Sequence, residues 1–142
     1  MKNICKLLLL FILIPSIGMA SDEKKAINKE KTISKTFEVS NDALLSVTNL
    51  YGNVNVYLWD ENKISIQVQI KVSGNNDKKV TERLNDIDIS FAATSNKVAA
   101  VTEINGKNWQ GNSNLSYEIN YVVKIPKNGN VDLNNKYGNI SI

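Results

Sequence analysis

The sequence predicts a mainly β protein built from stacked sheets, in a β-solenoid, β-helix-like or sandwich-like arrangement, with one short helix at about residues 77–86. Two observations support this fold class. Long segments alternate apolar and polar residues with the period of a strand, and one strand–turn–strand phrase occurs twice. A repeated unit of this kind is typical of folds in which each unit buries its apolar face against a neighbour.

The alternation is clearest in segments 63–72 and 115–125, and Pro126 ends the second of them. Shorter segments with the same alternation begin at residues 54 and 87. A strand with one apolar face has a well-specified register, because a slip of one residue would turn that face to water. The inward-facing positions are Ile64, Ile66, Val68, Ile70, Val72, Leu115, Tyr117, Ile119, Tyr121, Val123 and Ile125, with Val54, Val56, Leu58, Ile87, Ile89 and Phe91 in the shorter segments.

A helical period replaces the strand period after the break at 74–76. Val80, Leu84 and Ile87 are spaced i, i+4 and i+7, which predicts a helix of about ten residues. Asn76 or Asp77 would cap its N-terminus. We expect Val80 and Leu84 to lie against the sheet.

The repeated phrase is Asn-x-Tyr-Gly-Asn followed by alternating apolar residues, at 49–56 and again at 135–142. We expect the glycines to adopt backbone angles that a β-carbon disfavours. The asparagines would bond local backbone or stack on their equivalents one unit away, and the tyrosines would cover the corner. The residues of this structural turn motif are Tyr51, Gly52, Asn53, Tyr137, Gly138 and Asn139.

The N-terminus has the pattern of a secretory signal at residues 1–20. Lys2 and Lys6 precede the apolar run 7–14, and Gly18-Met19-Ala20 supplies small residues for cleavage. The run is too short to cross a bilayer, so no stable membrane span is expected after cleavage. We predict an exported protein of the periplasm, the outer cell surface or the extracellular space. Residues 21–32 are highly charged and predict a disordered leader, with the β-rich domain at 33–142.

Composition argues against several functions. Without the signal, 15 of the 17 basic residues face 14 acidic ones, so the charge gives no reason to expect nucleic acid as a partner. Histidine is absent and the one cysteine, Cys5, lies in the signal, which removes the usual nucleophilic triads and zinc ligands. The acidic pairs at 60–61 and 86–88 fit exposed turns better than catalysis. We therefore expect no enzyme activity, metal or cofactor.

Three aromatic residues are candidates for ligand binding. Tyr57 and Trp59 alternate with the apolar face of their strand and should point outward, where they would stack on sugars or anchor a protein. Cover by another part of the chain is the alternative for this pair. Trp109, in the polar loop 105–114, is the better candidate for an exposed contact.

Together these motifs carry a resemblance. The order Lys35-Thr-Phe-Glu-Val39, Tyr-Gly-Asn-Val, Trp59-Asp60, the strand 63–72, the helix 77–86 and a second Tyr-Gly-Asn resembles bacterial adhesin domains of unknown function. Those domains occur in exported proteins of Bacteroidota and are similar to the head domains of auto-transporter adhesins. The resemblance covers about 33–142. It implies a β-solenoid or β-helix-like domain with an adhesive or surface-structural role, a surface ligand that is a protein or a glycan, and no catalytic residues.

Domains of this family usually continue with further units, so the chain is a candidate fragment truncated at its C-terminus. Its last strand would then present an open edge at Ile140 and Ile142, where self-association is expected. Two other functions stay open at this point. One is a carbohydrate-binding or carbohydrate-active β-helix module, and the other is a periplasmic accessory domain in envelope stress signalling.

Overall fold

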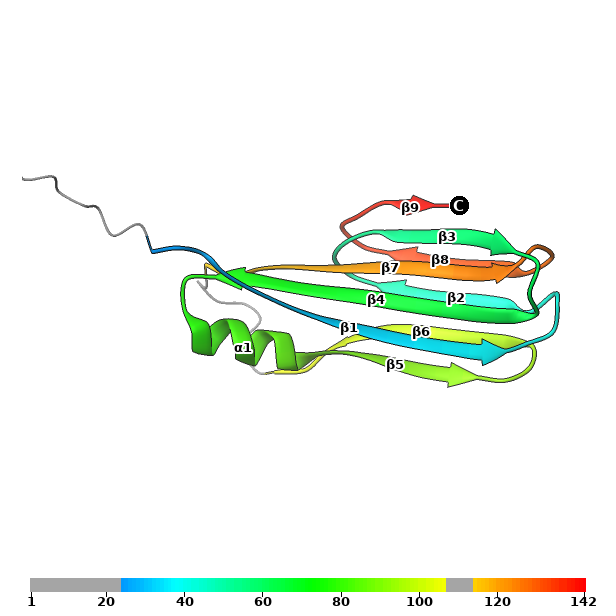
Figure 1. Ribbon diagram of the computed structural model, residues 1–142, viewed down its shortest axis with the longest axis horizontal. Coiled ribbons are helices and arrows are strands. Elements are labelled where there is room, and N and C mark those ends of the chain that lie inside the picture. Colours follow the sequence, from blue (N-terminus) through cyan, green and yellow to red (C-terminus); the bar gives the residue numbers. More distant parts are fainter. Residues whose placement is uncertain (1–23, 107–113) are drawn as a thin grey trace, which may run out of the picture.

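The computed structural model describes residues 24–106 and 114–142, which form two mixed β-sheets and one helix (Figure 1). The five-stranded sheet has the order β1 (Ile27–Glu38), β4 (Lys63–Gly74), β7 (Ser116–Pro126), β3 (Val54–Trp59) and β9 (Ile140–Ser141). The four-stranded sheet has the order β5 (Ile87–Ala93), β6 (Lys97–Ile104), β2 (Leu44–Asn49) and β8 (Asn130–Asn135). The prediction of a mainly β protein with one helix is confirmed.

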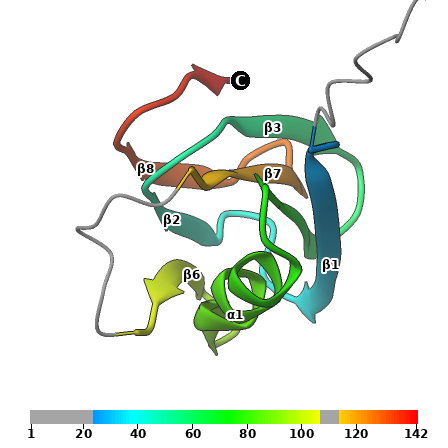
Figure 2. The same cartoon turned by 90° about the vertical axis from the view of Figure 1, so that its left-hand side faces the viewer.

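The chain crosses repeatedly from the four-stranded sheet to the five-stranded sheet. β2 leads into β3, β6 into β7, and β8 into β9. In one sheet β2 is parallel to both β6 and β8, and in the other β3 is parallel to both β7 and β9. The strands of the β2–β3 crossing therefore lie between the strands of the other two crossings, and the view along the long axis shows β8–β9 beside β2–β3 (Figure 2).

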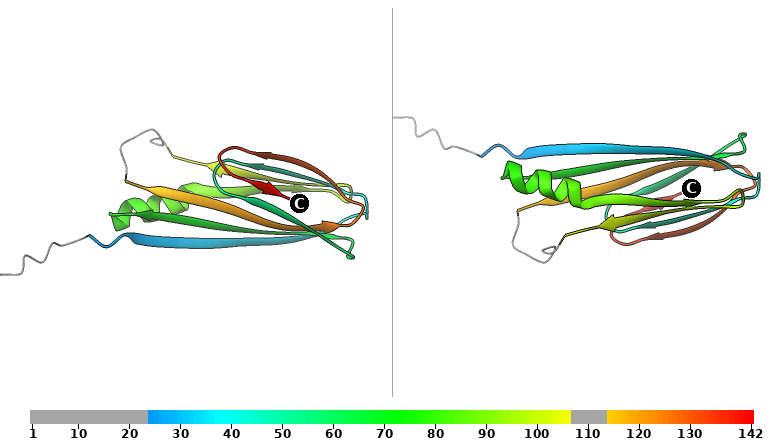
Figure 3. Two further views of the ribbon diagram at one scale, coloured as in Figure 1. Left: turned by 90° about the horizontal axis from the view of Figure 1, so that it is seen from above. Right: turned by 90° about the horizontal axis from the view of Figure 1, so that it is seen from below.

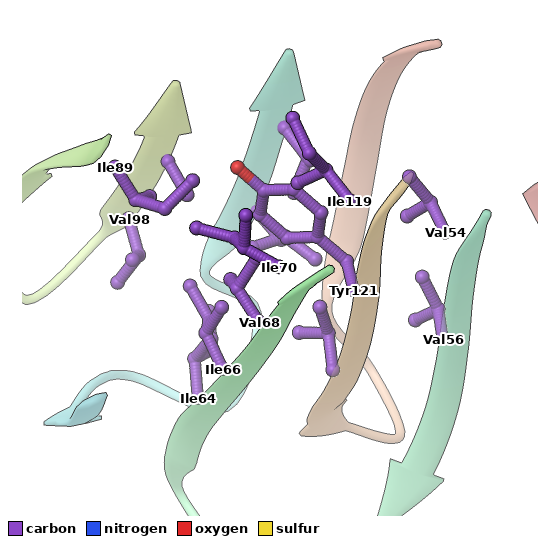
Figure 4. Close-up of a cluster of buried hydrophobic side chains, with 14 of the residues drawn as sticks. Val54, Val56, Ile64, Ile66, Val68, Ile70, Ile89, Val98, Ile119 and Tyr121 are labelled. Atoms are coloured by element: carbon purple, nitrogen blue, oxygen red, sulfur yellow. The ribbon is translucent and has the colours of Figure 1, made fainter. Parts of the chain in front are cut away.

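The apolar faces of the two sheets form one core (Figure 4). Ile64, Ile66, Val68 and Ile70 of β4 are fully buried, as the alternation predicts. Leu58 is the exception, because 54% of its surface is exposed although the pattern places it on the inner face. β9 pairs with β3 only at Val54 and Asn55, so among the described strands the second half of β3 has a neighbour, β7, on one side only, and Leu58 lies at this open edge.

The helix α1 (Asp77–Asp86) links β4 to β5 at one end of the elongated molecule (Figures 1 and 3). Its predicted bounds are confirmed. The side chain of Asn76 caps it by accepting a hydrogen bond from the backbone N–H of Lys79 at 3.0 Å. Val80 is completely buried, and Leu84 packs against the same core.

Strand β1 begins at Ile27, so the prediction of a disordered leader is wrong for residues 27–32. All twelve residues of β1 pair with β4 in an antiparallel ladder, and this backbone pairing does not depend on an apolar side-chain pattern. The Nζ atom of Lys29 forms an ion pair with the carboxylate of Asp77 at 2.9 Å and donates a hydrogen bond to the hydroxyl of Thr81 at 2.7 Å. The predicted signal peptide at 1–20 lies outside the described residues.

Candidate functional site

The two copies of the Tyr-Gly-Asn phrase lie side by side at the corners between the sheets. The N–H of Lys136 donates to the carbonyl of Asn49 at 3.1 Å, and the N–H of Gly52 donates to the carbonyl of Tyr137 at 3.2 Å. The backbone N–H of Asn139 donates to the side-chain oxygen of Asn53 at 3.1 Å. The second corner is therefore tied to the first through backbone and amide hydrogen bonds, as expected for the asparagines.

The glycines of the two corners differ in backbone conformation. Gly52 has φ +120°, and a β-carbon there would overlap the carbonyl oxygen of Ile119. In the second corner the positive φ belongs to Tyr137, at 66°, and not to Gly138. The prediction for Gly138 is thus wrong, because the left-handed residue lies one position earlier. Gly138 still has no room for a side chain, since a β-carbon would overlap the carbonyl oxygen of Gly52.

Three tyrosines gather at these corners. The rings of Tyr51 and Tyr137 stack with centroids 5.2 Å apart and an angle of 13° between their planes. The ring of Tyr117 meets Tyr51 edge-on at 4.7 Å. Burial, followed by the hydrogen bond with Tyr51, raises the pKa of Tyr117 to about 12, so its hydroxyl stays protonated at neutral pH. Tyr137 keeps 64% of its surface exposed, and the Nζ atom of Lys136 lies 5.1 Å from its ring centroid.

The stacked rings of Tyr51 and Tyr137 form one wall of an open groove of about 720 Å³, and Tyr117 also lines it, from the inner-face row of β7 that it shares with Val72. The floor is the outer face of β1, β4 and β7, where Glu30, Lys71 and Glu118 face one another in a single cross-strand row. The next row is formed by Asn28, Ser73 and Ser116, with the two serine hydroxyls 2.6 Å apart. We call this site the tyrosine groove; its lining also includes Lys29, Gly52, Asn53, Val72 and Gly138.

A buried chain of hydrogen bonds supports the corner from inside the core. The hydroxyl of Thr102 donates to the side-chain oxygen of Asn49 at 2.9 Å, and the hydroxyl of Tyr121 lies 2.8 Å from the same threonine oxygen. The amide nitrogen of Asn49 donates to the carbonyl of Ile119 at 2.9 Å. Burial raises the pKa of Tyr121 to about 12 despite the opposing effect of the Thr102 hydrogen bond.

The aromatic residues predicted from the sequence lie elsewhere. Trp59 is at the opposite end of β3 from the corner, where its indole N–H donates to the carbonyl of Lys63 at 2.7 Å and the Nζ of Lys124 lies 5.6 Å from its ring. Tyr57 is 56% exposed and pairs across the strand with Lys124. Trp109 lies outside the described residues. The structure therefore does not bring Tyr57 and Trp59 into the groove.

Sequence reasoning missed the groove because its floor comes from three strands far apart in the chain. The only local signal was the repeated tyrosine, which we interpreted as a cover for the corner. Two of the acidic residues considered for catalysis, Asp60 and Asp88, have structural partners. Asp60 pairs with Lys127 at 2.6 Å, and the carboxylate of Asp88 accepts a hydrogen bond from the N–H of Ile89 at 2.9 Å.

Two solved structures are similar to this chain. One is a putative adhesin from Bacteroides fragilis, with a TM-score of 0.40, 14% identity and coverage of 78% of this chain and 42% of that chain. The other is a putative cell adhesion protein from Clostridium sporogenes, with a TM-score of 0.44, 13% identity and coverage of 79% of this chain and 50% of that chain. Both names agree with the resemblance to adhesin domains. Neither a family model nor a curated protein matches the sequence.

Within residues 24–106 and 114–142, no helix is long and apolar enough to cross a membrane.

Proposed function

We propose that this chain is an exported, non-catalytic domain of the cell envelope with an adhesive or surface-structural role. The tyrosine groove is its contact surface, and the groove is the observation on which the proposal rests. It combines a stacked aromatic wall with a polar floor, a composition typical of recognition sites. The names of the two similar structures agree with this role.

The groove is also preorganised. Its wall stands on two corners that are joined by hydrogen bonds, and neither Gly52 nor Gly138 has space for a side chain. The floor lies on three strands paired along nine or more residues. A rigid site loses little conformational entropy on binding, which favours affinity for a ligand presented on a surface. We further infer that the parallel crossings act as rungs of a solenoid-like stack that supports this surface.

An adhesion assay tests the proposal. Beads coated with the mature chain, residues 21–142, are passed over immobilised mucin, collagen and peptidoglycan, and the fraction of beads retained is measured. We expect the wild-type chain and a Tyr57→Ala variant to be retained equally on at least one surface, and a Tyr137→Ala variant to be retained at least fivefold less. Retention on none of the surfaces, or equal retention of all three proteins, would contradict the proposed role.

Export is measured separately by fractionating cells that express the full chain. We expect the protein in the periplasm, the outer membrane fraction or the medium, with its mass reduced by removal of residues 1–20. A full-length protein confined to the cytoplasm would refute this part of the proposal.

A further inference from the structure

We propose that the tyrosine groove binds a short neutral oligosaccharide. This inference rests on the proposed adhesive function and names the chemical class of its ligand. A sugar ring has an apolar C–H face and a rim of hydroxyl groups, so its site needs an aromatic surface beside paired donors and acceptors. The groove supplies both, in the wall of Tyr51 and Tyr137 and in the floor of β1, β4 and β7.

The backbone of Tyr137 is the first argument. A φ of 66° is uncommon for a bulky residue. In the first corner the residue with a positive φ is a glycine, Gly52. Residues with strained backbone angles concentrate at functional sites, where the function of the side chain outweighs the energetic cost of the strain. Here the strain holds an aromatic ring, 64% exposed, beside the groove. Its partner Tyr51 fixes the ring plane by stacking at 5.2 Å.

The charges of the floor are the second argument. Lys71 lies between Glu30 and Glu118, and the amides of Gln69 and Asn120 donate to these two carboxylates at 3.3 Å and 2.6 Å. A carboxylate accepts hydrogen bonds from hydroxyl groups, and an ammonium group donates them. The lining holds two carboxylates, Glu30 and Glu118, and two ammonium groups, Lys29 and Lys71, so it offers no net charge to attract an ionic ligand. The floor is thus matched to an uncharged polyol.

Size is the third argument. The groove of about 720 Å³ lies within the range of about 300–1,000 Å³ found for small-molecule sites. The groove is open to solvent and its floor is part of the larger outer face of the sheet, so an oligosaccharide can continue beyond it. The second floor row, Asn28, Ser73 and Ser116, adds neutral hydrogen-bonding groups next to the charged row.

Isothermal titration calorimetry on the mature chain, residues 21–142, tests the inference. The probes are cellohexaose, chitohexaose, xylohexaose and mannohexaose, with hexagalacturonic acid and a hyaluronan hexasaccharide as anionic comparisons. We expect saturable binding of at least one neutral probe. Tyr137→Asn should weaken it at least tenfold and keep the fold, because asparagine tolerates positive φ. Tyr137→Phe, which keeps the ring, should stay within threefold of the wild type.

Tyr57→Ala is the matched control, since Tyr57 is 56% exposed and lies toward the other end of β3. Its affinity should stay within twofold of the wild type. The inference is overturned if no neutral probe binds, if an anionic probe binds more tightly, or if Tyr57→Ala abolishes binding while Tyr137→Asn does not. If beads still adhere through Tyr137 when every neutral probe fails, the ligand class is wrong and the adhesive function stands. Failure in both assays removes both proposals.

Discussion

Replacing Thr102 by valine should unfold the protein more easily than its small change in shape suggests. Thr102 is 7% exposed, and its single hydroxyl proton is donated to Asn49. The hydroxyl of Tyr121, 2.8 Å away, must therefore be the donor to the threonine oxygen. Valine leaves a buried tyrosine hydroxyl and a buried amide oxygen without partners. At about 1–3 kcal/mol for each orphaned group, we expect a loss of about 4 kcal/mol in the free energy of unfolding.

The same geometry predicts that a second substitution restores stability. Tyr121→Phe alone should cost about 1 kcal/mol, because Thr102 keeps its bond to Asn49. In the double variant only the oxygen of Asn49 lacks a partner, so the loss should be about 2 kcal/mol. The double variant is then more stable than Thr102→Val by about 2 kcal/mol.

Urea unfolding followed by tryptophan fluorescence and circular dichroism measures all of these free energies, provided that the m-values agree. Thr36→Val, at an exposed position of β1, is the control and should change stability by less than about 0.5 kcal/mol. If the losses from the two single substitutions simply add in the double variant, the assigned direction of the hydrogen bonds is wrong.

Three further predictions concern the corners, the pH dependence and the helix. Gly52→Ala should cost about 3 kcal/mol, since φ is +120° and the new methyl group meets a backbone carbonyl, whereas Gly129→Ala, which has no such φ, should cost about 1 kcal/mol; equal losses would contradict the argument. Because burial raises the folded-state pKa of Tyr117 and Tyr121 from 10.0 to about 12, their contribution to stability is complete below pH 10 and is lost as the pH rises to about 12. Unfolding titrations across this range should show the decline, with a smaller slope in Tyr121→Phe, and a flat profile would refute it. Asn76→Ala should cost about 1 kcal/mol in the same urea assay, and a change of less than about 0.3 kcal/mol would show that the cap contributes little.

Local patterns in the sequence predicted those parts of the fold that local physics determines. The alternation in 63–72 and the i, i+4, i+7 spacing after Asn76 each reflect one face of one element, and both elements were placed correctly. Residues 27–32 were missed because Ile27 is their only apolar residue that packs against the core, so that their strand structure depends mainly on backbone pairing with β4. The exposure of Leu58 likewise depends on how far β9 extends along β3.

The candidate site depended even more on non-local structure. The sequence identified the corner residues, but the choice of Tyr137 over Gly138 as the left-handed residue depends on how the second corner stacks on the first. The floor of the groove exists only because β1, β4 and β7 align Glu30, Lys71 and Glu118 in one row. The indole N–H of Trp59 donates a hydrogen bond to the backbone carbonyl of Lys63, and the alternation of apolar and polar residues does not predict this bond.

The position of β7 has a consequence for the order of folding. β3 and β4 are consecutive in the chain, yet β7 lies between them in the sheet, so the turn at 60–62 joins no hairpin. Among the residues that the structure describes, strands β2 and β3 pair only with strands that lie between residues 97 and 141. Pairings between such distant segments form slowly, because a long loop must close first. During folding, the segment 44–59 therefore keeps its strand edges unpaired until β6 and β7 come into contact with it.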